Sequence, residues 1–440
     1  YRVASHFQTP QSQPAPGYTQ VPNSAGGYAF ELDKWGRLRR FLVLGTEGGS
    51  YYAGEAELTR DNTTVVQSCI TEDGPRVVAE ITGISQLGRA PKNDPALFAL
   101  ALCFADGDLR TKQLAEKALP LVARTGTHLF HFAEFVSQFR GWGKLLKRAV
   151  AAWYEEKDPK TLAFQAVKYR QRDGWSHRDL LRLTHPDAGL IDTHLPAATY
   201  TTNVARAEVF DFMCGRESKE SVPEVIRGFE LIQTMADNPR AAAEVIELYG
   251  LPREAVPTEL LKSKEIWASL LKAIMPVEAM VRNLGNMSKC GLLVPGAAET
   301  QFVVSRLTNP EVILKSKVHP IKLLAALLTY GQGKGVRGKG EWQPVAQVVD
   351  ALDAAYYASY GNVEPTGKRI LVGLDASGSM QGGECAGVPG LSPAVGSVAN
   401  ALVTAHADPQ TIITEFTTRI APSTISPRQR LDDACRQIRR

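Results

Sequence analysis

The chain has 440 residues, of which 44% are hydrophobic and 22% are charged. This composition is typical of folded protein and excludes a disordered, collagen-like or low-complexity chain. At roughly 150 residues per domain, the length predicts two or three domains. The formal net charge of +4 neither demands nor excludes a nucleic-acid partner, so the position of the charge along the chain matters more than its sum.

Several features of the sequence favour a reducing, cytoplasmic setting. No apolar stretch approaches the roughly 18–20 residues of a membrane span, and the first residues lack the pattern of a signal peptide. The six cysteines are far apart and form no C-x-x-C pair, which favours free thiols over disulfides or a zinc site. We therefore expect a cytoplasmic protein without a membrane partner.

Most of the chain has a helical pattern. Residues 1–27 are rich in Gln, Pro, Gly and Ser and predict an extended N-terminal arm. From there to residue 362, apolar residues recur with helical spacing, and short Gly, Pro, Asp or Thr segments interrupt them. The clearest predicted helices are 94–105, 108–124, 128–139, 144–156 and 160–171. Such a series with short connections predicts an α-solenoid of antiparallel helices.

The pattern changes near residue 361, where Pro365-Thr366-Gly367 is typical of a linker. Residues 369–374 form a continuous apolar run, as expected for a strand buried on both faces. Residues 393–407 have helical spacing, and residues 411–417 are rich in β-branched side chains. This strand–helix–strand order predicts the start of an open parallel sheet in residues 366–440.

The positive charge is concentrated between residues 140 and 182. This segment holds eleven Lys and Arg residues against five Asp and Glu, a net charge of +6, so the rest of the chain is slightly acidic. Lys144, Lys147 and Arg148 lie at i, i+3 and i+4, which places three cations on one face of a helix. Five aromatic residues are interleaved with the cations of this segment: Trp142, Trp153, Tyr154, Tyr169 and Trp175.

Two interpretations of this basic segment stay open. Cations neutralise phosphates and release counterions, and aromatic rings stack on unpaired bases, so the pattern favours a nucleic-acid surface. Alternatively, the cations form a solvated helix face and the aromatic residues belong to the core of the solenoid. We favour nucleic acid for the cations as a group, and the core for the aromatic residues taken singly.

Other motifs point to no catalytic site. Residues 331–340 contain a GxGxxG pattern and nearly a P-loop, but both motifs follow a strand, and residues 320–330 have a helical pattern. We interpret this segment as a flexible basic loop. His128 and His131 lack a third ligand nearby and are interpreted as packing residues. Because no nucleophile–base pair is found, we expect a protein that is not an enzyme.

Asp375, Ser377 and Ser379 alternate directly after the apolar run of residues 369–374. One carboxylate and two hydroxyls are hard oxygen donors, which suit Mg²⁺. The carboxyl ends of strands are also where open α/β sheets bind ligands. The pattern therefore predicts a divalent-metal site. The alternative is a loop whose Asp and Ser side chains cap the next helix.

Long segments of the sequence resemble the TROVE domain of Ro proteins. They are residues 23–28 (NSAGGY), 37–52 (RLRRFLVLGTEGGSYY), 168–182 (KYRQRDGWSHRDLLR) and much of 319–357. Residues 375–380 (DASGSM) resemble the metal-ion-dependent adhesion site of a von Willebrand factor A domain. The abundance of Ala, Arg and Gly is more similar to bacterial Ro proteins than to animal ones.

This resemblance implies a mainly α fold. HEAT-like helical repeats would form a ring-like α-solenoid over residues 28–362, followed by an α/β von Willebrand factor A-like domain over residues 366–440. Only the N-terminal part of that domain is expected here, because the threonine and aspartate that complete the family's metal site would lie beyond Arg440. A Gly-rich stretch, residues 382–390, also follows the metal motif.

The resemblance also implies a function. Ro proteins bind small non-coding Y-type RNA on a basic outer surface and single-stranded 3′ ends of misfolded RNA in a central hole. Bacterial members resemble adaptors that deliver structured RNA to a 3′-exoribonuclease. The implied RNA contacts are Lys144, Lys147, Arg148, Lys168, Arg170, Arg172, His177 and Arg178. The implied ligands of a divalent cation, Mg²⁺, are Asp375, Ser377 and Ser379.

A different class of function remains as the alternative. In this alternative, the protein is a Mg²⁺-dependent protein-interaction scaffold that binds an acidic partner through the loop of Asp375, Ser377 and Ser379. The basic segment would then be incidental.

Overall fold

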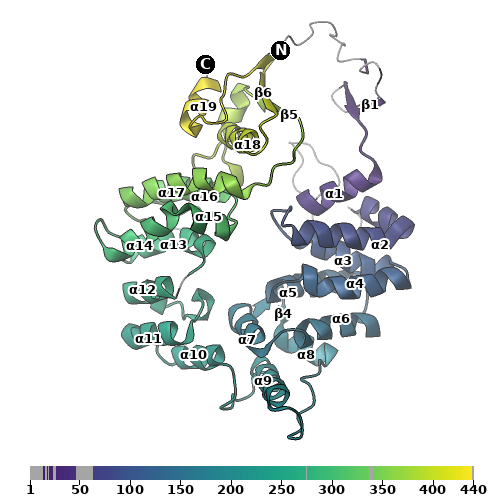
Figure 1. Cartoon of the computed structure of the whole chain (residues 1–440), viewed down its shortest axis with the longest axis vertical. Coiled ribbons are helices and arrows are strands. Elements are labelled where there is room, and N and C mark those ends of the chain that lie inside the picture. Colours follow the sequence, from purple (N-terminus) through teal and green to yellow (C-terminus); the bar gives the residue numbers. More distant parts are fainter. Residues whose placement is uncertain are drawn as a thin grey trace. The chain divides into compact units, whose positions relative to one another are not determined.

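The computed structural model describes residues 13–14, 17, 19–22, 26–45, 63–273, 275–335 and 340–438. The chain is mainly helical and divides into two compact units, residues 1–227 and 228–440, which are described one at a time (Figure 1). Among the described residues, no helix combines the length and the apolar character needed to cross a membrane.

The first unit begins with a short hairpin and continues as helices. Strand β1 (Gln20–Pro22) pairs antiparallel with β2 (Tyr28–Phe30), so the described end of the predicted arm is a paired strand. The helices are α1 (Lys34–Leu44), α2 (Thr64–Gln86), α3 (Asp94–Asp106), α4 (Leu109–Val122), α5 (Gly126–Phe139), α6 (Lys144–Glu155), α7 (Pro159–Lys168), α8 (His177–Thr184) and α9 (Ala197–Met213). A second hairpin, β3 (Gln171–Arg172) and β4 (Trp175–Ser176), separates α7 from α8.

The helices of this unit pack in two layers. In one layer α2 packs on α4, α4 on α6 and α6 on α8, and in the other α3 packs on α5 (Figure 1). Aromatic side chains fill the space between the layers: Phe98, Phe104, Phe130 and Phe132 are fully buried. Amphipathic helices that stack on alternate neighbours in this way form a solenoid, as the helical spacing predicts.

The predicted starts of the five helices lie within two residues of the observed ones, and side chains cap several of these helices. Asp108 Oδ1 accepts a hydrogen bond from Thr111 N at 2.7 Å before α4, and Asp158 Oδ1 accepts one from Thr161 N at 2.9 Å before α7. Each cap satisfies a backbone N–H that has no partner inside the helix. Helix α7 ends three residues earlier than predicted, because Gln171 belongs to the β3–β4 hairpin.

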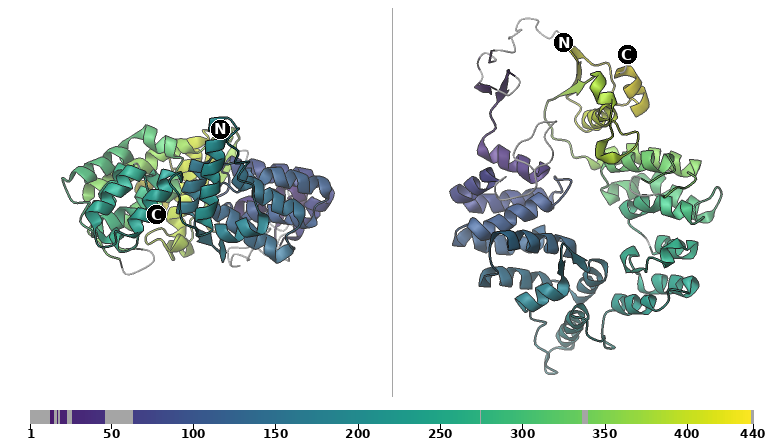
Figure 2. Two further views of the ribbon diagram at one scale, coloured as in Figure 1. Left: turned by 90° about the horizontal axis from the view of Figure 1, so that it is seen from below. Right: turned by 180° about the vertical axis from the view of Figure 1, so that it is seen from behind.

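The second unit continues the helical pattern. Helix α10 (Glu224–Gln233) spans the division between the units. The helices that follow are α11 (Pro239–Tyr249), α12 (Lys264–Lys272), α13 (Val277–Lys289), α14 (Ala298–Thr308), α15 (Pro310–Ser316), α16 (Pro320–Gly331) and α17 (Ala346–Ala358). Figure 2 shows the same helices from below and from behind. Helix α16 leads into the Gly-rich segment of residues 331–340, of which residues 336–339 lie outside the described part of the chain. Neither phosphate-binding motif therefore follows the strand it requires.

A small sheet follows the last of these helices. Strand β5 (Ile370–Asp375) pairs parallel with β6 (Thr411–Phe416), and α18 (Pro393–Ala407) connects them. Strand β7 (Ile420–Pro422) adds antiparallel to β6, and α19 (Leu431–Ile438) packs on α18. The predicted strand–helix–strand order is confirmed.

The prediction that the first strand is buried on both faces is wrong. In β5 only Leu374 is buried, whereas Leu371 is 71% exposed, and Ile412 beside it on β6 is 62% exposed. Helix α18 packs on the sheet, and the exposure of Leu371 and Ile412 shows that the face they share is largely uncovered. The apolar run therefore predicts the strand but not its surroundings.

The C-terminal part of this unit is held against α17. Arg430 Nη2 lies 2.6 Å from Asp353 Oδ2, and its guanidinium lies 4.2 Å from the centre of the Tyr357 ring. Leu431 N donates to Tyr357 Oη at 2.9 Å. These contacts fix the start of α19 on the last helix before the sheet.

Candidate nucleic-acid interface

Three of the predicted RNA contacts lie on α6. Lys144 is exposed at its first residue, Lys147 is half-buried, and the Arg148 side chain is 63% exposed. Arg148 donates to both oxygens of Glu116 on α4, with Nη2 and Oε2 2.7 Å apart, and this carboxylate raises the pKa of Arg148. The opposite face of α6 is buried, so the helix presents its cations outward.

The β3–β4 hairpin presents further cations beside α6. Its two-residue loop is Asp173-Gly174, with φ of 52° and 79°, the geometry of a type I′ turn. Glycine occupies the second position at no steric cost. The hairpin exposes Arg172, whose Nε lies 3.6 Å from Asp173 Oδ1.

Three contacts fix the position of this hairpin. Asp173 is paired with His131 on α5, and Trp175 Nε1 donates to Glu134 Oε2, also on α5, at 3.2 Å. The rings of Trp142 and Trp175 lie 5.6 Å apart, which places the hairpin beside the start of α6 (Figure 1). Cations that are far apart in the sequence therefore lie on neighbouring elements.

The remaining predicted cations surround the same hairpin. Lys168 ends α7, and its Nζ lies 5.4 Å from the ring centres of Phe164 and Tyr169. Arg170 is exposed just before β3, and Arg178 is exposed in the first turn of α8. The seven residues that we call the basic surface are Lys144, Lys147, Arg148, Lys168, Arg170, Arg172 and Arg178.

The prediction that His177 contacts RNA is contradicted. Its side chain is 3% exposed and lies among aromatic rings, with Phe130 at 4.8 Å between ring centres. Its Nδ1 is 3.0 Å from Tyr154 Oη, and burial lowers its pKa to about 4. His177 is buried because it shares a helix face with Leu180, Leu181 and Thr184, a spacing that the sequence already contains.

Four of the five aromatic residues of the segment divide into two groups. Trp153 and Tyr154 are fully buried, as the core interpretation predicts. Trp142 and Trp175 are only half-buried and lie in contact at the border of the basic surface. An indole pair beside cations offers a surface on which an unpaired base can stack.

One cation that the predicted RNA contacts omit lies on the same face of α8. Arg182 is exposed one turn after Arg178. The spacing of i and i+4 is the sequence signal that would have included it.

The predicted metal ligands lie at the carboxyl end of β5. Asp375 Oδ1 accepts hydrogen bonds from Ser377 N at 2.9 Å and from the Ser377 hydroxyl, and these bonds lower the pKa of Asp375. Ser379 is exposed in the 3₁₀ turn Gly378–Gln381. The loop thus holds an ionised carboxylate and a hydroxyl in contact, a donor pair that fits a hard cation.

Other predicted features have structural roles. His131 pairs with Asp173 and lies 3.8 Å from Asp94 Oδ1, so it holds the hairpin on α5. His128 is half-buried, and burial lowers its pKa to about 4. Within the described residues, no three His, Cys, Asp or Glu side chains gather as a metal site, and the six cysteines are free thiols.

Fold and surface together define a helical-repeat protein with a locally basic face. Comparison with known proteins extends this description. The profile of the TROVE domain matches residues 21–248 and 249–329. The RNA-binding protein RO60 of Deinococcus radiodurans is 40% identical over 420 residues, which are 94% of this chain and 76% of that protein.

A second relative and a solved structure also point to Ro proteins. The RNA-binding protein RO60 of Caenorhabditis elegans is 32% identical over 429 residues, which are 82% of this chain and 66% of that protein. The crystal structure of the Deinococcus radiodurans RO (RSR) protein matches with a TM-score of 0.79 at 39% identity, over 92% of this chain and 80% of that one. The chain belongs to the TROVE-domain family, and the resemblance to Ro proteins is confirmed.

Proposed function

We propose that this protein binds RNA through the basic surface, and that it acts by binding and not by catalysis. The observation that carries the proposal is the gathering of seven cations around the β3–β4 hairpin, beside a half-exposed tryptophan pair. Such cations neutralise phosphates, and the indoles can stack on unpaired bases. Both curated relatives are named RNA-binding proteins, which supports the same conclusion.

The test is a titration of a labelled hairpin RNA with the wild-type protein and with the triple variant Lys144→Ala/Lys147→Ala/Arg178→Ala. These three side chains are on the outward faces of α6 and α8. Losing three phosphate contacts should weaken binding at least a hundredfold, because each contact to a charged group contributes about 1.5 kcal/mol or more.

A matched control separates this surface from charge in general. Lys264, Lys289 and Lys315 are exposed in the second unit, outside the basic surface. The triple alanine variant of these lysines has the same loss of charge and should bind the hairpin RNA as the wild type does. Equal weakening in both triple variants would show that RNA is attracted by overall charge alone, and would refute the proposed surface.

The finer part of the proposal concerns which RNA is bound. We infer that the basic surface takes small non-coding Y-type RNA, that single-stranded 3′ ends of misfolded RNA bind elsewhere on the chain, and that a 3′-exoribonuclease acts on the delivered RNA. The same titration with a hairpin that carries a single-stranded 3′ tail tests this selectivity. Tighter binding of the tailed RNA is expected, and equal binding of both RNAs would refute it. The purified protein alone should leave the RNA intact.

The loop after β5 supports a second, separate proposal, that Asp375 and Ser377 hold Mg²⁺ together with Ser379. An ionised carboxylate in contact with a hydroxyl is the supporting observation. Calorimetric titration with MgCl₂ should give a binding signal that is lost in Asp375→Ala and kept in Asp350→Ala, an exposed carboxylate on α17. A signal unchanged in Asp375→Ala would refute the site.

This loop also favours the alternative function, a Mg²⁺-dependent scaffold for an acidic protein partner. That function predicts a partner whose binding a chelator abolishes while the triple variant of the basic surface retains it. A partner that stays bound after chelation would exclude the scaffold.

A further inference from the structure

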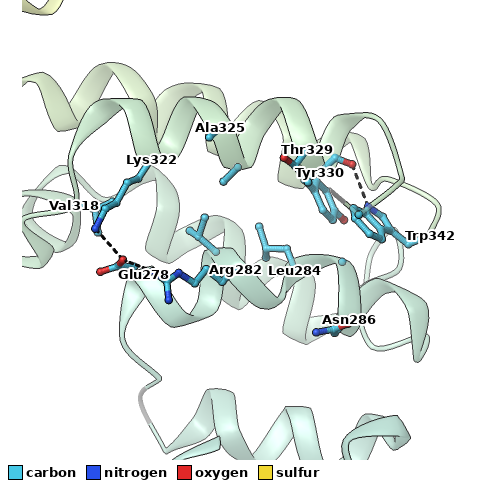
Figure 3. Close-up of a pocket in the computed structure, with 14 residues that line it drawn as sticks. Glu278, Arg282, Leu284, Asn286, Val318, Lys322, Ala325, Thr329, Tyr330 and Trp342 are labelled. Atoms are coloured by element: carbon cyan, nitrogen blue, oxygen red, sulfur yellow. Dashed lines mark hydrogen bonds and ion pairs between the residues drawn. The ribbon is translucent and has the colours of Figure 1, made fainter. Parts of the chain in front are cut away.

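A cavity of about 480 Å³ lies between α13 and α16 in the second unit (Figure 3). This volume is in the range of small-molecule sites, which are apolar clefts with a few polar groups placed at defined points. Gly335 and Trp342, which follow α16, line one end of it. None of the residues of the basic surface or of the Asp375 loop lines this cavity.

One end of the cavity is aromatic. The rings of Tyr330 and Trp342 lie 6.2 Å apart with an angle of 18° between their planes, and Trp342 Nε1 donates to Tyr330 O at 3.0 Å. Trp342 lies directly against α13 at Gly285, where a Cβ atom would be 2.8 Å from the indole. The position of the indole is therefore fixed before any ligand arrives.

Asn286 also borders this end, but its side chain lies on the side of α13 away from α16 (Figure 3). Asn286 is exposed on α13, and its Nδ2 donates to Asn283 Oδ1 at 3.1 Å. The amide is thus turned toward Asn283 and not toward the aromatic pair. The feature of this end that suits a nucleobase is therefore the aromatic pair, because every base can stack on an aromatic ring.

The other end of the cavity carries positive charge. Lys322 Nζ lies 3.0 Å and Arg282 Nη2 2.9 Å from the same oxygen, Glu278 Oε1. Two cations share one carboxylate, which leaves a net positive charge at this end (Figure 3). The cationic side chains are 52% and 73% exposed, respectively, so both can reach an anion.

Apolar side chains connect the two ends. Val281 and Leu284 of α13 face Ala325 and Ala326 of α16 across the cavity. From Glu278 to Asn286 the helix rises about 12 Å, at 1.5 Å per residue. In order along the cavity there are two cations, an apolar floor and an aromatic pair.

We propose that this cavity binds a nucleotide, with its phosphate at Lys322 and Arg282, its sugar on the apolar floor and its base against Trp342. The nucleotide is either a free mononucleotide or one unpaired nucleotide of an RNA strand. The proposal does not rest on the basic surface, since the residues of the two sites belong to different units.

The test is calorimetric titration of the full chain with AMP, CMP, GMP and UMP, with adenosine and inorganic phosphate as partial ligands. At least one mononucleotide should bind more tightly than both partial ligands. Lys322→Ala, which removes a phosphate contact, and Ala325→Leu, which fills the cavity, should each weaken this binding about tenfold or more. Lys289→Ala, an exposed lysine on α13 outside the cavity, is the matched control and should leave binding unchanged.

A second titration identifies the source of the nucleotide. If a short single-stranded oligouridylate loses affinity in Lys322→Ala and Ala325→Leu, the cavity takes a nucleotide of an RNA strand. If only the mononucleotides lose affinity in these variants, it takes a free nucleotide. The basic-surface triple variant should bind mononucleotides normally, which keeps the two proposals distinguishable.

Three results would overturn the proposal: no mononucleotide binding to the wild-type protein, binding of inorganic phosphate as tight as that of any mononucleotide, or binding that neither cavity variant weakens. Thermal unfolding of each variant checks that it folds. Because Lys322→Ala changes an exposed side chain, it keeps the test valid even if Ala325→Leu disturbs α16.

Discussion

His177 makes the stability of the protein depend on pH. Burial lowers its pKa from 6.5 to about 4 in the folded state. On acidification, this histidine takes up a proton in the unfolded chain at a higher pH than in the folded protein. The contribution of His177 to stability is therefore fully present above pH 6.5 and is lost as the pH falls to about 4. A pKa shift of this size corresponds to a change of about 3 kcal/mol in the free energy of unfolding.

We therefore predict that the free energy of unfolding by urea falls between pH 7 and pH 4.5, and that His177→Phe falls less steeply. Phenylalanine keeps the packing against Phe130 but cannot take up a proton. His128, which burial also protects from protonation, is present in both proteins, so the difference between the curves isolates His177. Curves of equal slope would contradict this account of His177.

Arg148 is a predicted RNA contact that another side chain holds in a bidentate ion pair. Its partner Glu116 competes with any phosphate for the guanidinium. If Arg148 contacts RNA, Glu116→Gln should strengthen hairpin binding about two- to fivefold, because an exposed ion pair contributes up to about 1 kcal/mol. The titration of the hairpin RNA measures this, and an unchanged affinity would assign Arg148 a structural role.

At the scale of elements, the β3–β4 hairpin organises the basic surface. A β-branched residue at position 174 would be strained, because φ is 79° there. Gly174→Val should therefore displace Arg172 and Trp175 and weaken RNA binding several-fold, with a loss of about 1–2 kcal/mol in stability.

Gly88 is the matched control for this substitution. It has a φ of 63°, a Cβ atom added there would meet no other atom within 4 Å, and it lies in the turn after α2, away from the hairpin. Gly88→Val should lower stability to a similar degree and leave RNA affinity unchanged. Similar affinities for the two variants would mean that the hairpin does not present the binding residues.

The sequence predicts helices better than it predicts short strands. The starts of α4, α5 and α7 follow from capping residues and apolar spacing, which are local signals. The β3–β4 hairpin is too short to show a period of two, although its Asp-Gly pair is a strong hairpin signal that could have revealed it. The exposed face of β5 could not be predicted, because burial depends on which elements cover the strand.

In the candidate RNA-binding site too, local sequence patterns predict some features, and others depend on how the elements pack. Helical spacing places Lys144, Lys147 and Arg148 on one face correctly. The pairing of Arg148 with Glu116, 32 residues away, depends on how α4 packs on α6, and no local pattern contains that packing. The prediction for His177 is wrong because it gives the residue's chemical type more weight than its place on the buried face of α8.

At the scale of the whole chain, the net charge of +4 conceals a basic segment of +6 in a slightly acidic protein. RNA binding by such a chain depends on where the cations lie and less on how many there are. If the cavity of the second unit binds a nucleotide of an RNA strand, as proposed, the protein contacts RNA at more than one place. The domain boundaries at residues 27/28 and 362/366 stay predictions.

The most direct test of the central claim is the salt dependence of hairpin RNA binding, compared between the wild-type protein and Lys144→Ala/Lys147→Ala/Arg178→Ala. Each neutralised phosphate contributes about 0.7–0.9 to the slope of log K against log salt concentration. We predict a steep slope for the wild type and a slope shallower by about 2–3 for the triple variant. Equal slopes for the two proteins would contradict the claim that RNA binds at the basic surface.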